Sequence, residues 1–313
     1  MKIVFLDAGT IAGWISLSPI RELGECKFYD YTAPEEVKPR IAGCDVLIIN
    51  KTKIGPAEID AAPNLKLIAE AATGVDNVDV KYAASKGIPV RNVAGYSTES
   101  VAQITWMHIL DLVCHSAYFD WSVKSGKYGN GHSFTDVSVG YYNLRGKKLG
   151  IVGLGHIGGR VAEIAGAFGM LISYFPTSGL AHSDRYPAVP LEQLLAENDI
   201  ISIHCPLNTG TKNLITYNEL KLMKKTGYIV NMARGAVVNE TDLVRALNEG
   251  LIAGAAADVY LDEPIPAYHP YFNVKDKYKL MLTPHVGCTS DESLTTLVAG
   301  IATNIRTYFA DGK

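Results

Sequence analysis

The stretch Gly150-Ile-Val-Gly-Leu-Gly-His-Ile-Gly-Gly-Arg160 decides the fold. It contains the pattern G-x-G-x-x-G, formed by Gly153, Gly155 and Gly158, directly after an apolar segment at 148–152. In a strand–turn–helix unit, the first glycine makes the tight turn and the second lets the backbone approach a pyrophosphate. The third packs the helix on the strand. The following helix would offer unpaired N–H groups to phosphates. The pattern therefore predicts a dinucleotide-binding turn.

Apolar segments alternate with helix-like segments along almost the whole chain, which predicts an α/β fold. Several of the apolar segments lack polar alternation, as is typical of parallel sheet covered on both faces. Thr216–Glu219 is a T-x-x-E capping box, and Asn239 is suited to cap the next helix. The predicted strands are 2–6, 27–29, 46–49, 65–68, 149–152, 171–174, 200–204, 228–231, 254–257 and 279–282, and further helices are predicted at 98–124, 160–168 and 291–309.

About 145 residues precede the glycine turn, although such a turn normally opens its domain. We therefore expect two doubly wound parallel-sheet domains with a cleft between them. A flavodoxin-like substrate domain would comprise 1–100 plus 288–313, and a Rossmann-type dinucleotide domain 101–287. Hinges are expected near Ser100 and 285–290. The predicted helix 98–124 is apolar on more than one side, which favours burial against a second copy in a homodimer.

Composition excludes several classes of protein. With 48% hydrophobic and 19% charged residues, the chain can bury full cores. A net charge of −3 predicts neither a nucleic-acid partner nor a membrane surface as partner. No apolar run approaches the roughly 18 residues of a membrane helix. The five cysteines are scattered without a C-x-x-C, so we expect reduced thiols, no metal site and a cytoplasmic location.

Three further motifs follow predicted strands in order: Asn231-Met-Ala-Arg-Gly235, Asp258-Val-Tyr-Leu-Asp-Glu-Pro264 and Thr283-Pro-His-Val-Gly287. With the glycine turn, they resemble the D-isomer-specific 2-hydroxyacid dehydrogenase family, and the resemblance covers essentially the whole chain. Within the family, the segments 50–52, 71–79 and 95–103 are most similar to those of glycerate dehydrogenases, also called hydroxypyruvate reductases.

The resemblance implies reversible hydride transfer between NAD(H) and a short D-2-hydroxy or 2-keto acid. Hydroxypyruvate and D-glycerate are the favoured pair, with glyoxylate as a side substrate. Other members of the family act on D-lactate, phosphoglycerate or bulkier 2-keto acids, and these remain alternatives. Some proteins with this fold sense NAD and bind partners without turnover, which is the alternative from a different class.

Three polar residues suit this chemistry. Arg234 offers a permanently charged planar fork for a carboxylate. His285 can carry a proton near neutral pH, and Glu263 would orient the imidazole and favour its protonated form. The resemblance assigns the same roles to these positions. Taken singly, the arginine could be a surface ion-pair partner, the glutamate a solvated loop carboxylate and the histidine structural. All three follow strand ends, where open α/β sheets build their ligand crevice.

The resemblance implies further contacts. Lys51 matches a basic position near the substrate, and Thr73, Gly74 and Val75 match a loop whose N–H groups hold the substrate carboxylate. Lys51 could equally be a surface lysine, and His204 a packed side chain. The expected cofactor contacts are Gly153, Gly155, His156, Ile157, Gly158, Phe175, His204, Cys205, Pro206, Ala233 and Asp258.

Phe175 departs from the expected pattern. It stands where an acidic residue normally binds the adenosine ribose and repels a 2′-phosphate. Arg185 is the nearest arginine and lies several residues further on. NAD is therefore the expected cofactor, with NADP not excluded.

Overall fold

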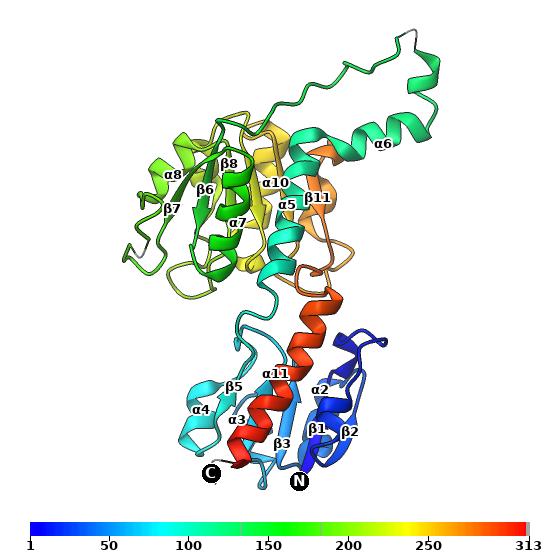
Figure 1. Cartoon of the computed structure of the whole chain (residues 1–313), viewed down its shortest axis with the longest axis vertical. Helices are drawn as coiled ribbons and strands as arrows, with labels where there is room; N and C mark the ends of the chain where they lie inside the picture. The colour runs from blue at the N-terminus through cyan, green and yellow to red at the C-terminus, as the bar shows by residue number, and fades with distance from the viewer. Residues whose placement is uncertain (132, 182, 311–313) are drawn as a thin grey trace. The chain divides into compact units, whose positions relative to one another are not determined.

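The computed structural model describes residues 1–131, 133–181 and 183–310, which form two compact units. Unit 1 comprises Met1–Ser97 and the chain from Cys288 onwards, and unit 2 comprises Thr98–Gly287 (Figure 1). Each unit is a parallel sheet covered by helices on both faces, so the predicted fold class is confirmed.

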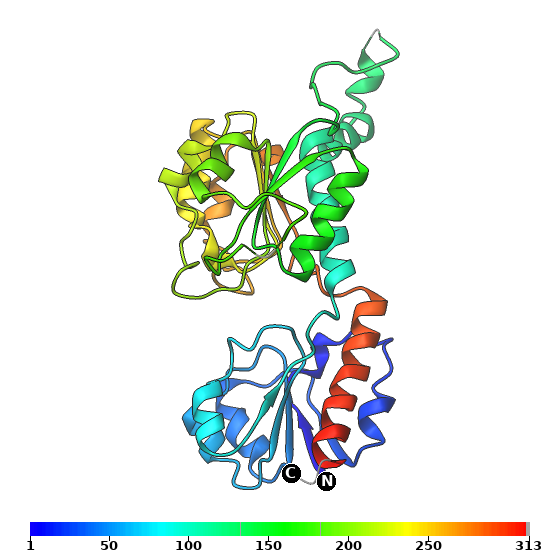
Figure 2. The same ribbon diagram turned by 60° about the vertical axis from the view of Figure 1, so that its left-hand side comes forward.

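The sheet of unit 1 has the order β2-β1-β3-β4-β5. Its central strands β1, β3 and β4 are largely buried, because successive side chains point to opposite faces and both faces are covered. The core on one face includes Phe5 and Ile48 with helices α1 and α11, and the core on the other includes Leu47 and Ile49 with α2, α3 and α4 (Figure 2). The elements are β1 Lys2–Phe5, η1 Ala8–Thr10, α1 Ser18–Arg21, β2 Glu25–Phe28, α2 Pro34–Ile41, β3 Val46–Ile49, α3 Pro56–Asp60, β4 Leu67–Glu70, α4 Val80–Ser85, β5 Val90–Arg91 and α11 Asp291–Ala310.

The sheet of unit 2 has the order β11-β10-β9-β8-β6-β7, with all paired strands parallel. Helices α5 and α7 pack together on one face, and α8, α9 and α10 cover the other (Figures 1 and 2). The elements are α5 Thr98–Cys114, α6 Ser116–Lys124, η2 Tyr128–Asn130, β6 Lys148–Val152, α7 His156–Ala167, β7 Leu171–Phe175, α8 Leu191–Glu197, β8 Ile200–Ile203, α9 Tyr217–Leu222, β9 Tyr228–Asn231, η3 Gly235–Val237, α10 Glu240–Glu249, β10 Gly254–Ala257, η4 Pro270–Asn273, η5 Lys277–Lys279 and β11 Leu280–Leu282.

The strands and helix caps predicted from local sequence patterns agree well with the structure. All ten predicted strands exist, and both predicted caps are confirmed: Thr216 closes a capping box, and the Asn239 side chain accepts the N–H of Asp242. Sequence analysis missed β5, because two half-buried residues give no periodic signal. It also placed β4 at 65–68, two residues early, and so left Glu70 out of the strand.

Two helix predictions were wrong in their bounds. Helix α7 begins at His156 rather than at 160. Its first turn contains glycines, whose low helix propensity gives no signal for a helix there. The expected single helix 98–124 is broken at His115, whose φ of 51° is left-handed. A left-handed residue interrupts the helical hydrogen-bond ladder and redirects the chain, and α5 and α6 therefore run in different directions (Figure 1).

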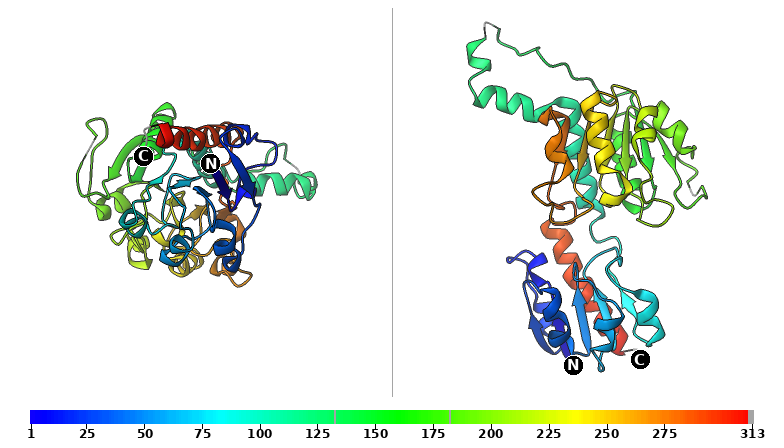
Figure 3. Two further views of the ribbon diagram at one scale, coloured as in Figure 1. Left: turned by 90° about the horizontal axis from the view of Figure 1, so that it is seen from below. Right: turned by 180° about the vertical axis from the view of Figure 1, so that it is seen from behind.

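Helix α6 and the described residues that lead back to β6 form an arm, residues 116–131 and 133–147, that extends away from the sheet of unit 2 (Figures 1 and 3). Several of its apolar side chains are open to solvent in the single chain. Phe134 is 94% exposed and Val137 is 83% exposed. None of the helices formed by the described residues is long and apolar enough to cross a membrane.

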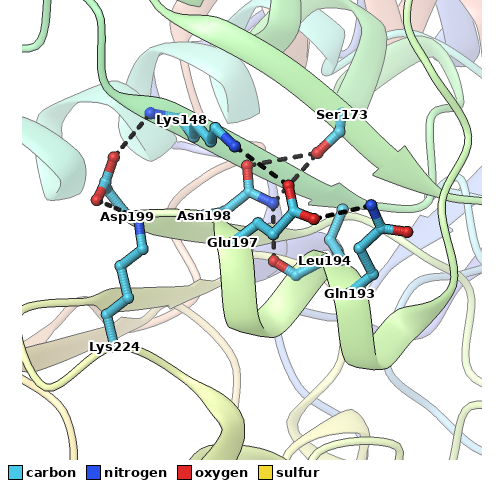
Figure 4. Close-up of polar contacts among 8 residues, drawn as sticks. All are labelled: Lys148, Ser173, Gln193, Leu194, Glu197, Asn198, Asp199 and Lys224. Carbon is cyan, nitrogen blue, oxygen red and sulfur yellow. Dashed lines mark hydrogen bonds and ion pairs between the residues drawn. The ribbon is translucent and has the colours of Figure 1, made fainter.

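A polar network ties the amino ends of β6 and β8 together (Figure 4). Asp199 accepts the backbone N–H of Lys148 at 2.9 Å and the ammonium of Lys224 at 2.7 Å, while Glu197 pairs with the Lys148 ammonium at 3.1 Å. Burial raises the pKa of Asp199, but these two hydrogen bonds outweigh it, and the net pKa is lowered. This edge of the sheet is occupied by structural contacts, and the motif residues lie at the opposite, carboxyl edge.

Candidate active site

The glycine turn follows β6 and has the geometry that a dinucleotide needs. Gly153 has a φ of 89°, and a Cβ there would lie 2.9 Å from the backbone of Cys205. A Cβ at Gly158 would lie 2.3 Å from the carbonyl oxygen of Gly153, so this glycine lets α7 pack on the turn. A Cβ at Gly155 would meet nothing within 4 Å. The second glycine therefore faces open space, in which a pyrophosphate could contact the backbone of the turn.

The residues around the turn have distinct surroundings. His156 is exposed at the first position of α7, next to the N-cap Gly155, and Ile157 is half-buried. Phe175 ends β7, where its carbonyl accepts the N–H of Gly153 at 3.1 Å and its ring packs on the core. The end of β7 thus lies beside the glycine turn but presents an aromatic ring instead of a carboxylate.

The loop after β8 supplies the other side of the turn. The Cys205 backbone touches Gly153, and burial raises the pKa of its thiol to about 11, so the thiol stays protonated. His204 lies 2.7 Å from the Ser202 hydroxyl, and burial lowers its pKa to about 3. His204 is thus a neutral, packed ring and no proton donor at neutral pH. Pro206 is exposed at the surface of this loop.

Arg234 follows β9 in extended conformation and is half-buried. The Asn231 side chain fixes the loop by accepting the N–H of Ala233 at 3.1 Å and donating to the Arg234 carbonyl at 3.0 Å. One guanidinium nitrogen donates to the Ala233 carbonyl at 2.9 Å. Gly235 follows, and a Cβ there would lie 1.9 Å from the carbonyl carbon of Tyr260. The arginine loop is therefore packed directly against the loop that leads to Glu263.

Glu263 and His285 come together, as their predicted roles require. Nδ1 of His285 lies 2.7 Å from Oε2 of Glu263, and both side chains are about one-quarter exposed. A carboxylate at this nitrogen fixes the orientation of the imidazole ring. Nε2 of His285 has no hydrogen-bond partner among the described residues, so the opposite side of the ring can exchange a proton with a ligand.

The backbone of His285 is strained. Its φ of 54° lies in the left-handed region that is unfavourable for a residue with a Cβ. The carboxylate of Asp258, a residue that is only 3% exposed, holds this turn through hydrogen bonds. Its Oδ1 accepts from the Thr283 hydroxyl and the Val286 N–H, and its Oδ2 accepts from the Gly287 N–H, at 2.6–2.8 Å. The carboxylate expected at the nicotinamide thus also anchors the histidine turn.

The remaining predicted residues lie in unit 1, at the carboxyl edge of its sheet. Lys51 is exposed after β3, and 73–75 follow β4. The Asn77 side chain joins the two loops by donating to the carbonyls of Asn50 and Thr52 at 3.2 and 3.1 Å. Within the described residues, the N–H groups of 73–75 make no hydrogen bond, as an anion-binding loop requires.

Sequence reasoning missed several supporting residues. Asp7 is buried and accepts the N–H groups of Asn50, Lys51 and Thr52. Glu70 is fully buried, and neither carboxyl oxygen has a hydrogen-bond partner within the described residues. Burial raises the pKa of Glu70 to about 9. The sequence signal that could have identified these residues is an acidic residue at the end of a strand or soon after it. Such residues lie at the carboxyl edge of the sheet, where the motif residues also lie.

A Rossmann-type sheet with an open glycine turn and a carboxylate–imidazole pair defines a dinucleotide-dependent oxidoreductase. Comparison with known proteins gives the family. A family profile described as "D-isomer specific 2-hydroxyacid dehydrogenase, NAD binding domain" matches residues 106–287. The chain belongs to the D-isomer-specific 2-hydroxyacid dehydrogenases, enzymes with an NAD-binding domain.

Individual relatives agree with this assignment. The chain is 41% identical to a glyoxylate reductase of Aeropyrum pernix over 262 residues, which is 82% of this chain and 76% of the relative. It is 34% identical to a hydroxypyruvate reductase of Blautia hydrogenotrophica, covering 100% of this chain and 98% of the relative. The crystal structure of a D-lactate dehydrogenase from Aquifex aeolicus with NAD and lactic acid superposes with a TM-score of 0.87 at 25% identity, over 99% of this chain and 97% of that chain.

Proposed function

We propose that this dehydrogenase interconverts hydroxypyruvate and D-glycerate, with glyoxylate as a second keto-acid substrate. The single observation that carries the chemistry is the 2.7 Å contact between Glu263 and His285. The nearby Arg234 suits the carboxylate that all these substrates share. The names of relatives that span most of this chain, glyoxylate reductase and hydroxypyruvate reductase, support a short substrate.

In this proposal, the chain's residues divide the work of keto-acid reduction. Arg234 binds the substrate carboxylate and holds the keto carbon in place. His285 donates a proton from Nε2 to the carbonyl oxygen, and Glu263 stabilises the imidazolium before that transfer. NADH, held on the glycine turn, would supply the hydride. In the oxidative direction, His285 accepts the hydroxyl proton instead.

The cofactor would lie on the glycine turn at the N-terminus of α7. The open space at Gly155 fits a pyrophosphate, and the N–H groups of the first helical turn suit its charge. Gly153, Gly158, Cys205 and Ala233 would shape this site by close packing. His156, Ile157, Phe175, His204 and Pro206 are proposed to border it, and Asp258 is proposed to contact the nicotinamide carboxamide.

For unit 1, we propose substrate contacts at Lys51 and at the 73–75 loop. Their positions at the carboxyl edge of the sheet and the unbonded N–H groups of the loop support this role.

We also propose that the enzyme is a cytoplasmic homodimer. The exposed apolar side chains of the arm are suited to burial against a second copy. The five cysteines are all free, which suits a reducing compartment.

The test is a panel of 2-keto acids assayed with NADH and with NADPH. The proposal expects the highest kcat/KM with hydroxypyruvate or glyoxylate, and a preference for NADH. Highest kcat/KM with pyruvate, a phosphorylated keto acid or a bulkier keto acid would reassign the substrate. Absence of turnover with every keto acid would favour an NAD-binding protein without activity.

A further inference from the structure

Glu240 is a buried carboxylate that none of the sequence motifs includes. It begins α10 and is 7% exposed, and its Oε2 lies 2.9 Å from Nε2 of the equally buried His269. Nδ1 of His269 accepts the backbone N–H of Tyr271 at 3.3 Å. The close contact with His269 limits the orientations open to the Glu240 side chain.

The other oxygen of Glu240 is directed at the loop that carries Glu263. Oε1 accepts the N–H of Leu261 at 2.8 Å. The adjacent residue, Tyr260, donates its own N–H to Oε1 of Glu263 at 3.0 Å. The close approach of Gly235 fixes the Tyr260–Leu261 peptide from its other side. Glu240 therefore anchors the Tyr260–Leu261 peptide, and the neighbouring Val259–Tyr260 peptide donates to the Glu263 carboxylate.

Tyr260 also reaches the histidine turn. Its hydroxyl donates to the carbonyl of Thr283 at 2.7 Å, two residues before His285. Burial raises the pKa of this phenol to about 12, so it remains a donor throughout the neutral range. The ring packs edge-on against His269 and Tyr271, with centroids 5.7 and 6.1 Å away. Tyr260 thus bonds Glu263 through its backbone N–H and the turn before His285 through its side-chain hydroxyl.

We propose that Glu240, held by His269, and Tyr260 are positioning residues that set the Glu263–His285 contact. Glu240 acts through the Leu261 peptide, and Tyr260 acts through its N–H and through the Thr283 carbonyl. The inference rests on the proposed acid–base role of His285. The titratable groups that face Glu240 are His269, Tyr260 and Tyr271. The charges of Asp258 and Glu263 also raise the pKa of Tyr260.

The first experiment compares Glu240→Ala, Glu240→Gln and Tyr260→Phe. Asn248→Ala is the matched control, since Asn248 lies on the same helix and anchors a neighbouring loop through Asn273 and Lys275. We expect Glu240→Ala and Tyr260→Phe to lower kcat about tenfold with KM within about twofold, because only proton transfer is misaligned. Glu240→Gln should recover part of the loss, since its amide oxygen can still accept from Leu261.

The pH profile separates positioning from plain stability. Weaker support of the imidazolium should move the alkaline limb of kcat/KM for keto-acid reduction to lower pH by about 0.5–1 unit. The control should lower Tm and leave this limb in place. Tyr260→Phe preserves the ring and its packing, so this variant still tests the positioning role if Glu240→Ala does not fold.

A second readout does not need turnover. The imidazole NMR titration of His285, assigned by the signal missing from His285→Gln, should show a lower midpoint in Glu240→Gln and Tyr260→Phe than in the unchanged chain. Loss of Tm with unchanged kcat, pH limb and midpoint would overturn the inference. An enzyme that turns over no keto acid would reject the proposed function, while the midpoint would still decide the positioning role.

Discussion

Nδ1 of His285 lies 2.7 Å from Oε2 of Glu263, although the two residues are 22 positions apart and on different loops. The contact leaves the other imidazole nitrogen without a partner among the described residues, which suits the proton transfer proposed for this pair. Replacing the histidine should therefore affect turnover far more than ligand binding.

His285→Gln removes the transferable proton while keeping a polar side chain of similar length. We expect kcat to fall about 10²–10⁴-fold with little change in KM, because the proton moves mainly in the transition state. His115→Gln is the matched control, since His115 also has left-handed backbone, with a φ of 51°. Steady-state assays of both variants check this, and near-normal turnover of His285→Gln would reject the assignment.

Arg234→Ala removes the proposed partner of the substrate carboxylate. A lost charge-assisted contact of about 1.5–3 kcal/mol should raise KM for the keto acid about 10–100-fold, and kcat should fall too. The affinity for NADH should change little. Arg245→Ala on α10, which removes an exposed pair with Glu249 and a contact with the Tyr217 ring, should leave the KM for the keto acid unchanged. Keto-acid KM values that match in the two variants would contradict the role.

Neighbouring glycines in α7 give a paired test of the dinucleotide turn. A Cβ at Gly158 would meet the Gly153 carbonyl at 2.3 Å, whereas a Cβ at Gly159 would meet nothing within 4 Å. Gly158→Ala should therefore weaken NADH binding at least tenfold and lower Tm. Gly159→Ala should bind normally and gain up to about 1 kcal/mol from helix propensity. Fluorescence titration with NADH and thermal melts distinguish the two, and equal behaviour would refute the packing argument.

Glu70 should make stability depend on pH. Its pKa is raised from 4.5 to about 9 by burial, so the folded state keeps a proton that the unfolded state loses. This contribution to stability is complete below about pH 4.5 and is lost as pH rises towards 9. Glu70→Gln should be more stable than the unchanged chain by about 1–3 kcal/mol at pH 8, and about equal near pH 4.5.

Denaturant unfolding at several pH values measures the difference that Glu70→Gln makes. The exposed Glu192→Gln on α8 provides a comparison with no expected pH trend. A stability difference for Glu70→Gln that stays constant between pH 5 and pH 8 would show that the carboxyl is ionised in the folded protein.

The arm should hold two copies together. Phe134→Asp combined with Val137→Asp places two charges among its exposed apolar side chains and should convert a dimer into monomers. Sedimentation equilibrium measures the mass directly. Leu180→Asp, on another exposed loop of unit 2, should leave the mass unchanged. A doubly substituted chain that still has the mass of a dimer would place the interface elsewhere.

Sequence reasoning succeeded where the signal is local. The glycine spacing, the apolar strands and the strand-end positions of Arg234, Glu263 and His285 all lie within short segments, and the structure places them at one sheet edge. Pairing of the last two follows because adjacent parallel strands β10 and β11 end side by side.

The supporting contacts could not be predicted in this way. Glu240 reaches Leu261 across 21 positions, and Tyr260 reaches Thr283 across 23. Neither contact leaves a periodic pattern, since each depends on how two loops pack in space. His115 was missed for a related reason: the apolar pattern continues through it, and only the backbone conformation breaks the helix.

The left-handed backbone of His285 has a consequence for how this chain responds to selection. A residue with a Cβ in this region costs about 1–2 kcal/mol relative to glycine. His285→Gly should therefore yield a more heat-resistant but inactive protein. Screening for thermostability alone would drive the chain away from histidine here, and under the proposed acid–base role a requirement for turnover would keep it in place.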